Sequence, residues 1–138
     1  MITISNTTKQ KIPKRLISLA IEETIEGEKH SISDISAVYC GDKFIKKINE
    51  KYLSHHYATD TISFRLNKGT LVEGEFYISL DTVRQNAIRF YSSYKQELIR
   101  VTIHSCLHLV GYKDNTKDEK ALMFKKENKY ISKVITLL

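Results

Sequence analysis

The chain has 138 residues, of which 41% are hydrophobic and 28% charged, and this predicts a single folded domain over residues 1–138. No stretch approaches the roughly 20 consecutive apolar residues of a membrane-spanning helix, so no membrane association is expected. The net charge of +6 favours a polyanionic partner such as RNA, although a solvated lysine-rich surface gives the same charge.

The two cysteines, Cys40 and Cys106, are too few for a disulfide framework, and no disulfide-linked partner is expected. The first residues lack the basic region and long apolar core of a signal peptide. These features together predict a cytoplasmic protein.

The first half of the chain predicts two strands and two helices. Residues 2–6 alternate as a short strand does, and residues 34–40 are rich in strand-forming types. Between them, residues 13–27 place apolar side chains at helical spacing. Asp42 can cap another helix that runs to about Tyr52 and turns three apolar side chains inward: Phe44, Ile45 and Ile48.

The second half predicts two strands followed by three helices. Residues 61–66 and 75–80 alternate clearly, and the turn residues at 67–69 favour an antiparallel pair. Asp81 is a candidate N-cap for a helix that ends near Phe90.

Two capping boxes mark the starts of the last two helices, one at Ser93 with Gln96 and one at Thr116 with Glu119. The element order β-α-β-α-β-β-α-α-α predicts an α+β domain with a small mixed four-stranded sheet and about five helices. The run from Leu98 to Val110 is apolar nearly all round, so its helix is expected to be central and buried.

Two histidines lie in that run, and they carry the main functional signal. His104 and His108 are four residues apart, which places both imidazoles on one helix face, one turn apart. Gly111 favours a left-handed helix end, after which the chain can fold back and present Asp114. Three protein ligands with one open position describe a catalytic zinc-type site.

Other interpretations of the histidines remain open. A histidine in an apolar helix is often a packed core residue, but two buried imidazoles must satisfy four nitrogens without water. A zincin protease is disfavoured because Ser105 stands where its catalytic glutamate follows the first histidine. Cys106 projects to another side of the helix and is interpreted as a small core residue.

Several segments together resemble the YbeY family. The stretch from His104 to Asp114 is similar to its signature, His-x3-His-x5-His with Gly-Tyr-Asp before the last ligand. Residues 59–64 resemble its Thr-Asp-Val-Leu-Ser-Phe strand, and the segment from Asn49 to Tyr52 resembles the one leading into it. Residues 74–79 resemble its Gly-Asp-Ile strand.

The resemblance implies a metal-dependent endoribonuclease, specific for single strands, that matures the 3′ end of small-subunit ribosomal RNA and supports ribosome quality control. It implies ribosomal RNA as the partner, with ribosomal proteins or a ribosome-associated GTPase as further partners. It also implies that Asp60 and Ser63 line the cleft, although Asp60 can equally cap the strand that follows.

Three positions depart from the family pattern. Asp114 stands where most members have the third histidine; a carboxylate suits Zn²⁺ and also widens the choice towards Mn²⁺ or Ni²⁺. Leu53 replaces an arginine that is thought to engage RNA phosphate, and Arg65 replaces a proline. Candidates to supply the missing cation are Arg65, His55 and His56, each of which can equally be a solvated surface residue.

The expected mechanism uses one divalent ion, held by His104, His108 and Asp114, whose metal-bound water attacks the phosphodiester. No residue is assigned as general base, and Ser63 is a possible helper. Two alternatives stand beside it. One is a metal-dependent hydrolase of another substrate, such as a peptidase. The other is a non-catalytic ribosome-assembly factor with a structural metal, which Leu53 in place of arginine favours.

Overall fold

A mixed four-stranded sheet forms one side of the molecule. The computed structural model describes residues 1–53 and 61–137. The strands are arranged in the order β1-β2-β4-β3, in which β1, β2 and β4 run parallel and β3 is antiparallel to β4. Their bounds are β1 (Ile2–Asn6), β2 (Ser31–Cys40), β3 (Thr61–Arg65) and β4 (Leu71–Ser79).

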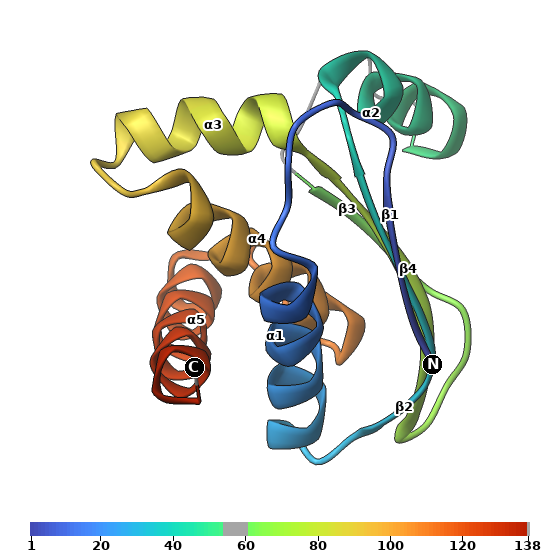
Figure 1. The fold of residues 1–138 in the computed structure, drawn as a ribbon. Coiled ribbons are helices and arrows are strands. Elements are labelled where there is room, and N and C mark those ends of the chain that lie inside the picture. Colours follow the sequence, from blue (N-terminus) through green and yellow to red (C-terminus); the bar gives the residue numbers. More distant parts are fainter. Residues whose placement is uncertain (54–60, 138) are drawn as a thin grey trace.

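The helices α1 and α4 pack on one face of the sheet, and α5 packs on these two helices on the side away from the strands (Figure 1). The helix α4 is central, because it packs against α1, α3, α5, β3 and β4. This arrangement confirms the predicted α+β fold and the central position of the histidine helix. The helices are α1 (Lys14–Gly27), α2 (Asp42–Ile48), η1 (Asn49–Leu53), α3 (Leu80–Arg89), α4 (Tyr94–Leu109) and α5 (Lys117–Thr136).

The helix α4 is buried because it is apolar nearly all round. Leu98, Ile103 and Leu107 are fully buried in the main core. Each such side chain contributes about 1.5–3 kcal/mol through removal of apolar surface from water. This packing gives the two histidines a rigid backbone.

The end of α4 has the geometry that Gly111 predicts. Gly111 has a positive φ of 103°, which an L side chain rarely adopts. Its N–H donates to the His108 carbonyl at 3.1 Å, and the Tyr112 N–H donates to Leu107 at 3.0 Å. This pair of bonds is a Schellman motif. The chain therefore reverses direction three residues after His108 and leads to α5.

The alternation of β3 predicts its two faces, but not what covers the polar one. Ile62 is buried in a second, smaller core cluster with Cys40 and Ile45. On the other face, the Thr61 hydroxyl lies 2.6 Å from the Ser105 hydroxyl, and Arg65 reaches the same helix further along. The polar face of β3 therefore contacts α4.

Some boundaries differ from the sequence-based prediction. The helix α3 begins with Ser79 as its N-cap instead of Asp81, because the Asp81 carboxylate accepts a hydrogen bond from the Asp42 N–H at 2.9 Å. The helix α2 has Gly41 as its N-cap instead of the predicted Asp42, whose carboxylate accepts from the hydroxyls of Ser79 and Thr82. It ends at Ile48 and continues as a π-helical turn, η1. Phe44, predicted to face inward, is 41% exposed and stacks on Tyr77. In the described residues, no helix is long and apolar enough to cross a membrane.

Candidate metal centre

The structure brings the side chains of His104, His108 and Asp114 together. The two Nε2 atoms on α4 lie 3.0 Å apart. Oδ2 of Asp114, in the loop before α5, lies 3.3 Å from His104 Nε2 and 3.5 Å from His108 Nε2. All three side chains are partly exposed, so the cluster lies at the protein surface.

The second nitrogen of each imidazole fixes the tautomer of its ring. His108 Nδ1 lies 2.9 Å from the backbone carbonyl of Tyr112, and His104 Nδ1 lies 2.7 Å from a carboxylate oxygen of Glu127. A carbonyl and a carboxylate oxygen can only accept hydrogen bonds, so Nδ1 is the protonated nitrogen in both rings. In the neutral rings, both Nε2 lone pairs are then left to face Asp114.

Three electron-pair donors converging on one point suit a cation. Donor atoms about 2.0–2.2 Å from a tetrahedral zinc ion lie about 3.3–3.6 Å from one another. The observed separations of 3.0, 3.3 and 3.5 Å are close to that spacing. Two imidazole nitrogens and one carboxylate oxygen are also a ligand set that zinc accepts. The residues present therefore fit a divalent ion, and they form the one such group among the described His, Cys, Asp and Glu side chains.

Sequence reasoning missed Glu127, which hydrogen-bonds His104. Glu127 is only 6% exposed and lies on the buried stripe of α5, in register with Met123, Tyr130 and Ile131. An acidic residue at a position that helical periodicity assigns to the core is a signal for a buried carboxylate with partners. The identity of those partners depends on the packing of α5 on α4.

A second buried carboxylate, that of Glu28, supports His108 indirectly. It accepts hydrogen bonds from the hydroxyl of Tyr112 at 2.5 Å, from the hydroxyl of Tyr130 and from Lys126 Nζ at 3.2 Å. Tyr112 is the residue whose carbonyl oxygen accepts from His108 Nδ1. Glu28 thus joins the end of α1, the loop after α4 and the helix α5.

The pKa of Glu28 makes this contact testable by pH. Burial raises the pKa, but the hydrogen bonds from Tyr112, Tyr130 and Lys126 outweigh burial and hold it below its ordinary value. Because the folded-state pKa is lower than that of the unfolded chain, the stabilisation is complete above the unfolded value, about 4.3. It is lost as the pH falls through the folded-state pKa.

We therefore expect Glu28→Gln to lower the free energy of unfolding by about 1–3 kcal/mol at pH 7, since the amide is uncharged and has one acceptor oxygen where the carboxylate has two. The difference from the wild type should be unchanged between pH 7 and about 5 and should shrink as the pH falls from there to about 3. Urea denaturation across this range measures both quantities, with Glu22→Gln on the exposed face of α1 as the control. A difference that does not vary with pH would contradict the assignment.

Of the predicted catalytic helpers, the structure describes Arg65 and Ser63, and both make hydrogen bonds within the protein. The Arg65 guanidinium already donates to Asn67 Oδ1 at 2.9 Å and to the carbonyls of Leu109 at 2.9 Å and Gly69 at 2.6 Å. The Ser63 hydroxyl donates to the Ser105 carbonyl at 3.4 Å. A role of either residue towards RNA stays a prediction. His55, His56 and Asp60 lie outside the described residues.

Cys106 lies between the two histidines in the sequence but does not join them in space. Its side chain is fully buried in the main core, and burial raises the pKa of the thiol. A protonated thiol is a poor metal ligand. The interpretation of Cys106 as a core residue therefore agrees with its surroundings.

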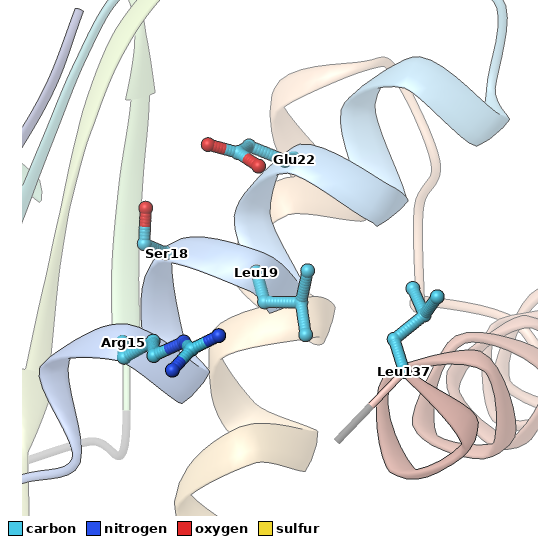
Figure 2. A pocket seen from close by; sticks show the side chains of 5 residues that line it. All are labelled: Arg15, Ser18, Leu19, Glu22 and Leu137. Carbon is cyan, nitrogen blue, oxygen red and sulfur yellow. The ribbon is translucent and has the colours of Figure 1, made fainter.

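The described part of the molecule also has a hollow whose lining includes none of the three candidate ligands. It has a volume of about 540 Å³ and lies between α1 and the C-terminal end of α5. Figure 2 shows Leu19 and Leu137 on its opposite sides, with Arg15, Ser18 and Glu22 along α1. The converging donors, and not this hollow, therefore identify the candidate centre.

Two histidines on a buried helix, with an acidic side chain completing the donor set, form a three-ligand group of the kind that catalytic zinc sites of hydrolases use. A sequence model described as "Endoribonuclease YbeY" matches residues 2–135. The chain therefore belongs to the endoribonuclease YbeY family, as the resemblance of its motifs predicts.

Individual relatives support the same assignment over nearly the whole chain. An endoribonuclease YbeY from Chloroherpeton thalassium is 56% identical, covering 95% of this chain and 93% of the relative. One from Chlorobaculum parvum is 47% identical, covering 96% and 94%. The solution structure of TM1509 from Thermotoga maritima is similar with a TM-score of 0.70 and 28% identity, covering 97% of this chain and 89% of that chain.

Proposed function

We propose that this protein is a metal-dependent endoribonuclease, specific for single strands, that matures the 3′ end of small-subunit ribosomal RNA and serves ribosome quality control. The observation that supports the proposal is the convergence of His104, His108 and Asp114 in a chain of this family. The preferred ion is Zn²⁺, with Mn²⁺ or Ni²⁺ as alternatives because one donor is a carboxylate.

The residues around the centre have distinct parts in this proposal. His104, His108 and Asp114 hold the ion through Nε2, Nε2 and Oδ2. When bound, the ion supplies Lewis acidity and lowers the pKa of water towards neutrality. The Glu127 carboxylate and the Tyr112 carbonyl hold the two imidazoles in the orientation that leaves their lone pairs available. The partial exposure of the cluster allows a flexible RNA strand to approach.

The partners follow from the substrate. A ribosomal RNA substrate fits the net charge of +6, because lysine and arginine side chains can neutralise RNA phosphates. Ribosomal proteins and a ribosome-associated GTPase are the proposed protein partners. This role places the protein in the cytoplasm.

Cleavage of a defined RNA tests the proposal. We expect the purified protein with Zn²⁺ to cut a labelled single strand that carries the 3′ end of small-subunit ribosomal RNA, and to leave a fully paired duplex intact. EDTA should abolish the cleavage, and added Zn²⁺ or Mn²⁺ should restore it. Gel analysis of the products, with a parallel preparation of the His108→Ala variant, separates this activity from contaminating nucleases.

A second candidate function is that of an RNA-binding assembly factor with a structural metal. It is favoured by Leu53, which stands where most family members have an arginine. That function predicts salt-sensitive binding of the same RNA without cleavage in any metal. It also predicts unfolding on chelation. Both results together would replace the nuclease proposal.

A further inference from the structure

Glu127 is a buried acid whose two carboxylate oxygens have different partners. Oε2 lies 2.7 Å from His104 Nδ1, and Oε1 lies 3.0 Å from the Arg100 guanidinium. The side chain is 8% exposed. A buried carboxylate is costly unless it is paired, so both contacts are needed to keep it in the core.

Arg100 holds this carboxylate from the same helix that carries the histidine. It lies one turn before His104 on α4, and its second terminal nitrogen donates to Asn128 Oδ1 at 2.8 Å. Its guanidinium also lies over the Phe124 ring, 5.1 Å from the centroid. With three anchors on α5, the arginine has little freedom to turn the carboxylate away from His104.

The position of the proton on His104 follows from this contact. An ionised carboxylate can only accept, so the imidazole must present its N–H at Nδ1 and its lone pair at Nε2. A neutral histidine free in water prefers the opposite tautomer, with the proton on Nε2. Without Glu127, the nitrogen that faces His108 and Asp114 would therefore carry a proton in much of the population.

We propose that Glu127, oriented by Arg100, is a positioning residue that selects the metal-ready tautomer of His104. The inference rests on the proposed metal site and deepens it, since it explains why one ligand is available before any ion binds. His108 does not depend on Glu127, because its Nδ1 donates to the backbone of Tyr112. The two histidines should therefore respond differently to the same substitution.

Nitrogen-15 NMR of the imidazole rings in metal-free protein, at an alkaline pH where histidine is neutral, reads the tautomers directly. We expect Glu127→Ala to move His104 towards the Nε2–H form and to leave His108 unchanged. Calorimetric titration with Zn²⁺ should show binding weakened about 10–100-fold. Glu127→Gln retains an amide oxygen that can accept from Nδ1, so it should restore part of both properties.

Val134→Ala is the matched control, because Val134 is a buried core residue of α5 and is not a partner of the histidines. It should destabilise the protein without changing the tautomers or the zinc affinity. If Glu127→Ala fails to fold, the test uses Glu127→Gln and Glu127→Asp instead. The tautomer of His104 in these two variants is then compared with that in the wild type.

The inference alone would be overturned if the Glu127 variants kept the His104 tautomer and the zinc affinity of the wild type, while the wild type binds zinc and cleaves RNA. A wild type that binds no divalent ion would overturn the proposed function instead, and the tautomer measurement would still decide the role of Glu127.

Discussion

Replacing His108 with alanine is expected to weaken Zn²⁺ binding by more than about 100-fold. Loss of a residue that only hydrogen-bonds a metal ligand typically weakens metal binding about 10–100-fold, and loss of the ligand itself should weaken it more. RNA cleavage should fall to background. The fold should persist, because most of the core lies among α1, α4, α5 and the sheet, away from the partly exposed His108 side chain. The melting temperature of the metal-free variant should fall by about 2–5 °C.

Calorimetric titration with Zn²⁺ and thermal unfolding measure these two effects, and Asp114→His is the companion variant. It replaces the carboxylate with the imidazole that most family members have at this position, so metal binding should be retained. Loss of all metal affinity in Asp114→His would mean that Asp114 is not the third ligand. Unfolding of the wild type by a chelator would assign the ion a structural role.

A valine in place of Gly74 is expected to destabilise the protein by about 3 kcal/mol, near the upper end of the usual cost of overpacking. Gly74 is buried in β4, directly beneath the end of α4. A Cβ atom there would lie 2.9 Å from the Leu109 side chain and 3.0 Å from the Phe64 carbonyl oxygen. The backbone contact cannot be relieved by rotation of a side chain.

Leu109 follows His108 directly, so the strain should also reach the metal centre. We expect Gly74→Val to weaken Zn²⁺ binding in addition to lowering stability, as urea denaturation and calorimetric titration would show. Glu73→Val is the matched control, because it places the same β-branched side chain at an exposed position of β4. Equal stability of the two variants would show that α4 can move away from the sheet without cost.

The parts of the site that follow local rules could be predicted from the sequence. Spacing of four residues puts His104 and His108 on one helix face, and Gly111 ends that helix with a positive φ. Thr116 and Glu119 form the predicted capping box of α5, which confines Asp114 to a short loop between two helices. Each of these features depends on residues that are near one another in the chain.

The missed features depend on residues that are distant in the chain. Glu127 contacts His104 across 23 positions, and Glu28 contacts Tyr112 across 84. Arg65 shows the same limit, because alternation assigns its face correctly but does not reveal that the end of α4 covers it. Asp81 was a plausible helix cap by type, yet its carboxylate is used by Asp42 from another helix.

The division of the donor set between a helix and a loop has an evolutionary consequence. His104 and His108 belong to the most buried helix of the fold, where most substitutions would disturb the packing. Asp114 lies in a partly exposed loop, so a change of this residue leaves the interior intact. In the proposed centre, a single substitution at position 114 can therefore change the ligand set while the core stays the same.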